Sequence, residues 1–234
     1  EQVVYVWFDA LVNYITGLGY GSDSFDNLLN YWDEAETREH VIGKGITRFH
    51  ALYWPAMLIS AGMVVPTRVF VHGYVTVEGK KIGKSAGNTV DPLPLAASFG
   101  RDALRYYLLR HIRSTEDGDF SDARFQQAYV SELAGQFGNL VHRSIKMMEA
   151  YRGGVVSLTG HEGQEATERL LHSSEALAGL VASRIAEFAF DRALEGIWQF
   201  IADANRTIAE VQPWALAKSG DDAELDRCLF ALFR

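Results

Sequence analysis

Cysteine is almost absent from this sequence, with Cys228 alone among 234 residues. A single cysteine excludes an intrachain disulfide and a zinc site built on several cysteines. Long apolar runs are also lacking, because no stretch reaches the roughly 18 consecutive apolar residues of a membrane-spanning helix. The N-terminus shows no basic segment ahead of an apolar one, so no signal peptide is expected. Together these absences predict a cytoplasmic protein.

Basic charge is in deficit as well, since the formal net charge is −8. This acidic balance argues against indiscriminate binding of nucleic acids. Lysine and arginine nevertheless gather in residues 80–84 and 101–113, so a selective RNA partner stays possible. Hydrophobic residues make up 48% of the chain, which is ample for a packed core in one large or two small domains.

The first half alternates between short apolar runs and helical patterns. Strands are expected at 3–8, 40–45 and 68–77, and helices at 10–16 and 46–62. Gly73 predicts a bend in the third strand region, and Pro55 a kink in the second helix. This order of elements predicts a parallel α/β sheet, in which ligands bind at the carboxyl ends of the strands.

The second half is predicted to be a helix bundle. Helical periods cover residues 100–112, 123–150, 165–183, 190–211 and 223–234, with a polar break at 114–120. The last period stops without a cap or polar tail, so the sequence is expected to be a fragment. The predicted domains are 1–92 for the α/β part, 93–121 for a connecting region and 122–234 for the helical domain, truncated at its C-terminal end.

A glycine-rich loop at Glu78–Asn88 carries two lysines three residues apart. It superficially matches the phosphate-binding P-loop, in which four residues separate the first glycine from Gly-Lys-Ser. Here only three residues separate Gly79 from Gly83. Glu78 stands where the first glycine is needed, so its carboxylate would face the phosphates. The spacing therefore argues against a P-loop phosphotransferase.

Six segments follow one another along the chain: YVWFDALVNY, VIGKGITRFHALYWPAML, VFVHGYVTVEGKKIGKSAGN, GRDALRYYLLR, FGNLVHR and ANRTIAEVQPW. Taken together they resemble the methionyl-tRNA synthetase family of class I aminoacyl-tRNA synthetases, in the part that follows its zinc knuckles. The resemblance implies the second half of a Rossmann-type parallel sheet with a C-terminal helix bundle that binds the anticodon. It further implies methionine, ATP with Mg²⁺ and tRNA-Met as substrates and partners, and no zinc site in this part.

Within this resemblance, KIGKS at Lys81–Ser85 is similar to the family's KMSKS loop, with Lys84 as the main phosphate contact and Lys81 as its helper. Ammonium groups on a mobile loop stabilise the charge that develops on departing pyrophosphate. The ATP-binding residues that the resemblance implies are Gly43, His72, Val75, Lys84 and Ser85. Without the resemblance, the two lysines also fit a solvated basic turn, and the valine a buried strand.

The resemblance also implies a pocket for the methionine side chain. Its members are Trp7, Ala10, Leu11, Tyr14, Ile46, His50 and Trp54. A polarizable thioether gains from contacts with aromatic rings and from apolar burial. His50 and Trp54 stand one helical turn apart, so one helix face can present both. A core histidine and a core tryptophan are the alternative interpretation.

In the helical half the resemblance implies Asn139, Arg143 and Trp214 as readers of the tRNA anticodon. Asn139 and Arg143 stand four residues apart on one helix face, and Trp214 follows the helix-ending Pro213. Hydrogen-bonding groups beside an aromatic ring suit unstacked RNA bases. A solvated helix face and packing within the bundle explain the same residues without RNA.

Three departures from the family pattern bear on function. The family's amino-terminal half, with its HIGH motif, is not in this sequence, so the isolated chain is expected to be inactive as a ligase. Gly45 stands where the family usually has aspartate after Gly-Lys, so an acidic contact expected near the ATP ribose is missing. Ile82 and Gly83 replace methionine and serine of KMSKS, which is a mild change. The main alternative is a non-catalytic synthetase-like paralogue that binds tRNA or a protein partner.

Overall fold

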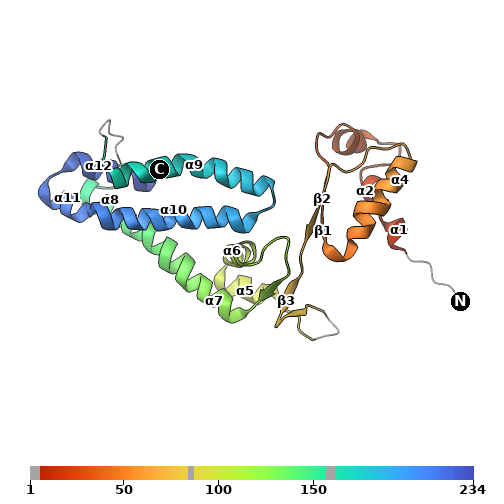
Figure 1. The fold of residues 1–234 in the computed structure, drawn as a ribbon, viewed down its shortest axis with the longest axis horizontal. Coiled ribbons are helices and arrows are strands. Elements are labelled where there is room, and N and C mark those ends of the chain that lie inside the picture. Colours follow the sequence, from red (N-terminus) through yellow and green to blue (C-terminus); the bar gives the residue numbers. More distant parts are fainter. Residues whose placement is uncertain (1–5, 84–86, 157–161) are drawn as a thin grey trace. The chain divides into compact units, whose positions relative to one another are not determined.

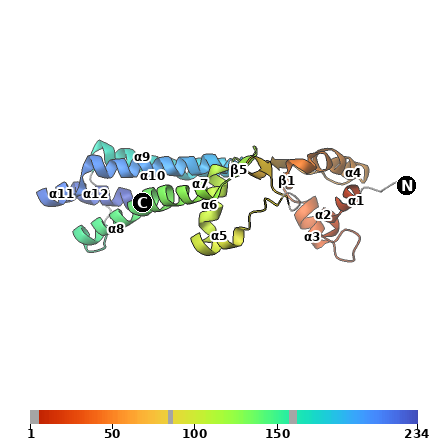
Figure 2. The same ribbon diagram turned by 90° about the horizontal axis from the view of Figure 1, so that it is seen from below.

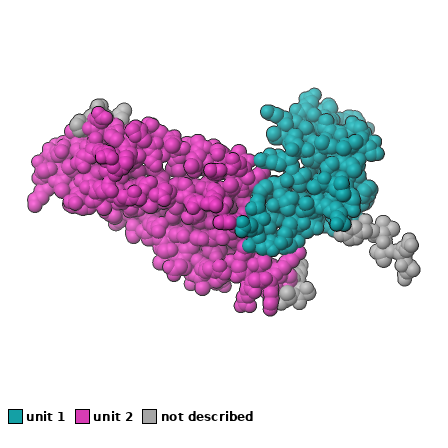
Figure 3. Space-filling view, viewed as in Figure 1, with its two compact units in different colours: residues 1–74, 115–117 teal, residues 75–114, 118–234 magenta. Residues whose placement is uncertain are grey.

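The chain forms two compact units in a computed structural model that describes residues 6–83, 87–156 and 162–234. Unit 1 comprises residues 1–74 with 115–117, and unit 2 comprises residues 75–114 with 118–234 (Figure 3). Each unit has its own clusters of buried apolar side chains, as expected of parts that fold around separate cores.

Unit 1 is an α/β arrangement of short elements. They are α1 (Trp7–Ala10), α2 (Asn13–Thr16), α3 (Asp26–Leu28), the π-helical turn η1 (Leu29–Asp33), β1 (Glu39–Gly43), the 3₁₀ turn η2 (Lys44–Ile46), the π-helical turn η3 (Phe49–Tyr53), α4 (Trp54–Ser60) and β2 (Arg68–His72). β1 and β2 are parallel, in a register that places Gly43 opposite His72 at their carboxyl ends (Figure 1). The helical segment between them is the crossover that parallel pairing requires.

The core of unit 1 lies among its helices and is dominated by large side chains. Leu11, Ile15, Leu28, Trp32, Trp54 and Leu58 are each at most 6% exposed. Burial along β1 alternates as in a half-buried strand, so that His40 and Ile42 face inward. Pro55, which has no N–H to donate, lies where η3 passes into α4.

Unit 2 joins a small sheet to a bundle of helices. In the sheet, β3 (Val75–Val77) lies between β4 (Lys80–Lys81), which is antiparallel to it, and β5 (Gly118–Phe120), which is parallel to it. The helices are α5 (Pro92–Phe99), α6 (Arg101–His111), α7 (Asp122–Ala128), the π-helical segment η5 (Tyr129–Gly138), α8 (Asn139–Arg152), α9 (Glu165–Ala186), α10 (Phe190–Val211), α11 (Pro213–Ser219) and α12 (Asp222–Phe233). α9 and α10 run antiparallel and side by side in both Figure 1 and Figure 2. Within the described residues, no helix is both long enough and apolar enough to cross a membrane.

The predicted fold class, an α/β part followed by a helix bundle, is confirmed. Gly73 does separate β2 from β3. A side chain there would begin 2.0 Å from the Glu116 carbonyl oxygen, so only glycine lets these backbones approach. The domain boundaries predicted from the sequence stay a prediction.

Two predictions about individual elements are wrong. The described end of the strand predicted at 3–8 is helical, because Trp7 and Phe8 belong to α1. Short apolar runs do not distinguish a strand from a helix, and Trp7 here packs against Phe49 as part of a helical face. The polar break at 114–120 contains β5, whose polar sequence reflects a strand in which Phe120 alone is fully buried.

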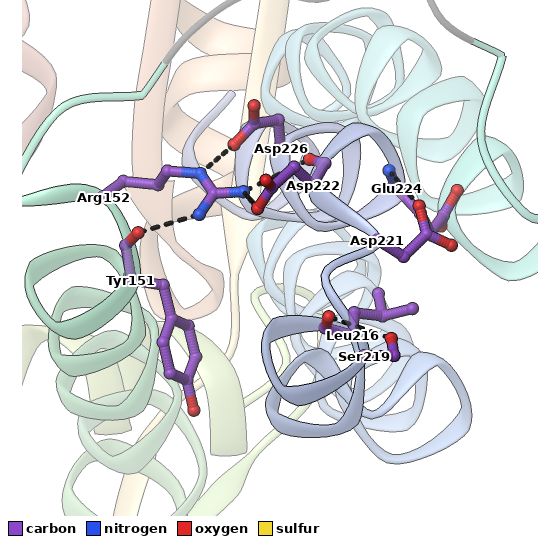
Figure 4. Close-up of polar contacts among 8 residues, drawn as sticks. All are labelled: Tyr151, Arg152, Leu216, Ser219, Asp221, Asp222, Glu224 and Asp226. Carbon is purple, nitrogen blue, oxygen red and sulfur yellow. Dashed lines mark hydrogen bonds and ion pairs between the residues drawn. The ribbon is translucent and has the colours of Figure 1, made fainter.

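Charged side chains fasten α8 to α12 within the bundle (Figure 4). The Arg152 guanidinium, at the end of α8, donates to the carboxylates of Asp226 and Asp222, the latter at 2.8 Å. Asp221 caps the start of α12 by accepting the Glu224 N–H at 3.4 Å. These contacts hold α12 on α8, and α11 packs against both of these helices.

Glu168 on α9 and Arg227 on α12 form a second link. Arg227 donates through Nε and a terminal nitrogen to both Glu168 carboxylate oxygens at 2.8 Å, and the two side chains are only about one-fifth exposed. The Gly163 N–H donates to the same carboxylate at 2.7 Å. The bonds from Arg227, with the one from Gly163, lower the pKa of Glu168 from its ordinary value of 4.5 to about 2. A depressed folded-state pKa means that this pair stabilises the fold fully above about pH 4.5 and loses its effect as the pH falls toward 2.

We expect Glu168→Gln to lower the free energy of unfolding by about 2 kcal/mol at pH 7, because it removes a bidentate charged hydrogen bond. The difference from the unchanged chain should shrink as the pH falls from 4.5 toward 2. Urea unfolding at a series of pH values measures this. Glu165→Gln is the control, because Glu165 is 88% exposed in its pair with Arg169 and should contribute little. A difference that does not vary with pH would contradict the assignment.

Candidate functional site

Tyr14 and His50 form the centre of the predicted methionine pocket. The Tyr14 hydroxyl oxygen lies 2.8 Å from His50 Nε2, and His50 Nδ1 lies 3.1 Å from the Ile46 carbonyl oxygen. A carbonyl only accepts, so Nδ1 carries the proton, and in the neutral ring Nε2 accepts the bond from Tyr14. Burial raises the pKa of Tyr14, which keeps its hydroxyl protonated at neutral pH. The two bonds therefore fix the orientation of a histidine that is 1% exposed.

A second histidine, His40 on β1, completes this aromatic group. Trp54 Nε1 donates to His40 Nε2 at 3.1 Å, and the His40 ring centroid lies 4.4 Å from that of Tyr14 and 5.6 Å from that of His50. Burial, with a smaller contribution from His50, lowers the pKa of His40, so its ring is neutral at neutral pH. Trp32 packs edge-on against Trp54 at 6.0 Å. His40 thus adds a neutral ring to the aromatic group.

His40 and Trp32 were not among the residues predicted from the sequence. The alternation of β1 could have placed His40 on the inner face, since it lies two residues from the buried Ile42. Trp32 belongs to a stretch without a clear period, so no comparable signal pointed to it. A pocket of about 400 Å³ opens beside Tyr14 and Trp32, and residues 37–41 form much of its lining. Of the residues predicted for the methionine pocket, Tyr14 alone lines it.

The predicted pocket residues divide into an enclosed and an exposed group. In the enclosed group, Leu11 and Trp54 belong to the core cluster and the partly buried Tyr14 packs against it. The buried His50 joins them through Tyr14. Ile46 contributes the carbonyl that orients His50. Trp7 and Ala10, on α1, are exposed, and the Trp7 ring centroid lies 5.8 Å from that of Phe49 on η3.

Gly43 and His72 lie next to each other at the carboxyl ends of β1 and β2. This edge is where parallel α/β sheets bind ligands. Beside it, Lys44 Nζ lies 2.6 Å from Asp117 Oδ2 and 4.7 Å from the centroid of the Tyr74 ring. The other predicted ATP-binding residue that is described, Val75, begins β3 of unit 2 and is 36% exposed.

The loop with the two lysines extends from β4 of unit 2. Lys81 ends β4 and is exposed, whereas Lys84 and Ser85 lie outside the described residues. Asn88 bridges the two sides of the loop, because its Nδ2 donates to the Lys81 carbonyl at 3.2 Å and its Oδ1 accepts the Gly83 N–H at 3.1 Å. The asparagine was not predicted as part of the site, yet it closes the base of the loop.

Asp119 on β5 fixes the turn that precedes the loop. Its carboxylate accepts the Gly79 N–H at 2.8 Å, the Thr76 hydroxyl at 2.9 Å and an Arg124 nitrogen at 2.9 Å. The Gly79 and Thr76 bonds are the largest causes that lower the pKa of Asp119. A charged Asp119 thus joins β5 to β3 and to the turn at Gly79, from which the loop continues.

The predicted anticodon residues lie on the bundle of unit 2. Asn139 and Arg143 are exposed in the first turns of α8, and Trp214, in the first turn of α11, is 46% exposed. Met147, one turn after Arg143, packs against the cluster that holds Leu216 of α11. The face of α8 that carries Arg143 therefore continues into the contact with the helix that carries Trp214.

Among residues 6–83, 87–156 and 162–234, no three His, Cys, Asp or Glu side chains lie close enough together to hold a metal ion. Cys228 is buried in α12, and burial raises the pKa of its thiol to about 12. The expected absence of zinc stays a prediction.

A sequence model of the family described as tRNA synthetases class I (M) matches residues 1–145. The chain belongs to the class I methionyl-tRNA synthetase family. It is 42% identical over 233 residues to a methionine–tRNA ligase of Thermotoga maritima, covering 98% of this chain and 36% of that protein. It is 40% identical to the methionine–tRNA ligase of Mycobacterium leprae, covering 100% of this chain and 43% of that one.

Solved structures of the synthetase family agree with this assignment. A crystal structure of Mycobacterium tuberculosis methionyl-tRNA synthetase bound by methionyl-adenylate matches with a TM-score of 0.88 and 39% identity, covering 98% of this chain and 45% of that one. Its ligand-free form matches with a TM-score of 0.85. The chain thus spans less than half the length of these synthetases.

Proposed function

We propose that the protein containing this chain is a methionine–tRNA ligase, which activates methionine with ATP and transfers it to tRNA-Met. The observation that carries the proposal is the hydrogen-bonded Tyr14–His50 pair among aromatic rings, in a chain of this family. A thioether gains from aromatic contact and needs few hydrogen bonds, and the neutral His40 ring adds no charge that would attract a competing polar side chain. We expect this reaction in the cytoplasm.

In the activation step, a methionine carboxylate oxygen would form a bond to the α-phosphorus of ATP while the bond to pyrophosphate breaks. ATP enters as its Mg²⁺ complex, a substrate. Gly43 and His72 would lie beside the nucleotide at the strand ends, together with Val75 and Ser85. Lys81 and Lys84 would stabilise the charge on the departing pyrophosphate. The residues of the amino-terminal half would complete the site, so the isolated chain is expected to be inactive.

Recognition of tRNA-Met is assigned to the bundle. Asn139 and Arg143 would bond to base edges, and Trp214 would stack on an unpaired base. Their exposure and the packing of α11 on α8 support this role. We further propose that residues 1–92 form the catalytic part, residues 93–121 a connecting region and residues 122–234 the anticodon-binding domain.

The test measures two reactions with the full-length protein: methionine-dependent ATP–pyrophosphate exchange and charging of tRNA-Met. Both should occur with methionine and fail with leucine. Trp214→Ala should lower kcat/KM for charging by about 10-fold or more, since stacking on one base contributes about 1–3 kcal/mol. It should leave exchange unchanged, because exchange needs no tRNA. Phe25→Ala, which removes an exposed aromatic ring from unit 1, is the control for both reactions.

A synthetase-like paralogue that binds tRNA or a protein partner without catalysis is the second candidate. Gly45 favours it, because the side chain that the family carries there is missing. Binding of tRNA without any methionine-dependent exchange would establish this candidate in place of the ligase.

A further inference from the structure

The Tyr74 hydroxyl lies next to Gly45, close to the carboxyl ends of β1 and β2. A Cβ atom on Gly45 would lie 2.5 Å from the Tyr74 hydroxyl oxygen and 3.7 Å from Cζ. Gly45 has no left-handed φ, so its backbone conformation is open to other residues. The obstacle to a side chain at position 45 is therefore the Tyr74 hydroxyl, which stands where that side chain would begin.

Tyr74 is held in this place from its backbone and its ring. Asp117 Oδ1 accepts the Tyr74 N–H at 2.8 Å, and Asp117 Oδ2 lies 2.6 Å from Lys44 Nζ. The same ammonium group lies over the Tyr74 ring, 4.7 Å from its centroid. Lys44 adjoins Gly45 in the chain, and Asp117 binds the Tyr74 backbone. The Lys44–Asp117 ion pair therefore links the segment of Gly45 to that of Tyr74.

We propose that the Tyr74 hydroxyl binds a ribose hydroxyl of the nucleotide, in place of an acidic side chain at position 45. The proposal rests on the proposed function, which brings ATP to this edge of the sheet. Acidic side chains at the carboxyl ends of strands bind ribose hydroxyls in doubly wound α/β folds. A phenol also donates and accepts hydrogen bonds, and it does so without placing a second negative charge near the triphosphate. Lys44 and Asp117 act as positioning residues for Tyr74.

The test compares ATP with its 2′-deoxy and 3′-deoxy analogues in the full-length protein, by exchange kinetics and by direct calorimetric binding. The unchanged protein should prefer ATP over one of the two analogues by about 5-fold, as expected for one neutral hydrogen bond. Tyr74→Phe should raise KM and Kd for ATP by about 5-fold. It should leave KM and Kd unchanged for the deoxy analogue that the unchanged protein binds less tightly. Tyr20→Phe, an exposed tyrosine in the same unit, should keep the preference.

Two further variants separate the hydroxyl from a structural role of the ring. Gly45→Ala should weaken ATP binding, because its Cβ displaces the Tyr74 hydroxyl. Gly45→Asp combined with Tyr74→Phe should restore the preference for ATP, since removal of the hydroxyl makes room for the carboxylate. An equal preference in Tyr74→Phe and the unchanged protein would overturn the inference alone. Nucleotide binding that depends on Tyr74, without methionine-dependent exchange, would support the inference and overturn the proposed ligase.

Discussion

Lys84→Ala in the full-length protein is expected to lower the rate constant of methionine-dependent ATP–pyrophosphate exchange by about 100-fold or more. The ammonium group would face charge that grows on the departing pyrophosphate, and donors directed at developing charge have effects of this size. KM for methionine should change little, because Lys84 is not part of the proposed methionine pocket. Stopped assays at saturating ATP and methionine measure the rate constant.

The neighbouring lysines give this experiment its controls. Lys81→Ala should have a smaller effect, in keeping with the helper role proposed for it. Lys80→Ala removes an exposed lysine that pairs through its backbone with Val77, outside the KIGKS pattern, and should leave the rate constant unchanged. Equal rate constants for Lys84→Ala and the unchanged protein would remove the loop from the mechanism.

Trp54→Ala is expected to have the largest effect on stability, lowering the free energy of unfolding of unit 1 by about 3–5 kcal/mol. Trp54 is 1% exposed, packs against Trp32 and Tyr14, and donates to the buried His40. Its loss leaves a cavity and removes the donor that His40 accepts from. Hydrogen exchange of the unit 1 amides, followed by mass spectrometry, reports this loss within the full-length protein.

Trp54→Phe separates packing from hydrogen bonding at this position. It keeps most of the apolar volume but loses the indole N–H, so the expected loss is smaller, about 1–3 kcal/mol. KM for methionine should rise in both variants, because Tyr14 and His50 lose a neighbour. Unchanged protection of the unit 1 amides in Trp54→Ala would contradict the place of Trp54 at the centre of this core.

Most helices of the second half could be predicted because their apolar residues repeat with a helical period. The stripe of α10, with Ile201, Ala204 and Ile208 buried, is the clearest case. Elements of a few residues were harder. The helix α1 and the strand β5 carry too few residues for a period, so the contacts of Trp7 with Phe49 and of β5 with β3 decide them.

The candidate site was predictable to a similar degree. Motif order pointed to Tyr14, His50 and Trp54, and the structure brings these three side chains together. It did not point to His40, whose partner Trp54 lies 14 residues further on, within the crossover. Likewise, the sequence showed that Gly45 lacks the acidic side chain usual in the family, but no pattern in it predicted that the Tyr74 hydroxyl lies beside Gly45.

The sequence by itself determined the types of groups available, their order and the family to which the chain belongs, because these depend on local pattern. Only the tertiary structure decided which histidine accepts from Trp54, what closes the base of the lysine loop, and which hydroxyl fills the space beside Gly45. Each of these contacts joins residues that the folded backbone brings close: β1 and the crossover helix α4 for His40 and Trp54, the ends of the paired strands β1 and β2 for Gly45 and Tyr74, and a loop for Lys81 and Asn88. Distances between such residues depend on how the whole chain packs, so they cannot be predicted from local sequence patterns.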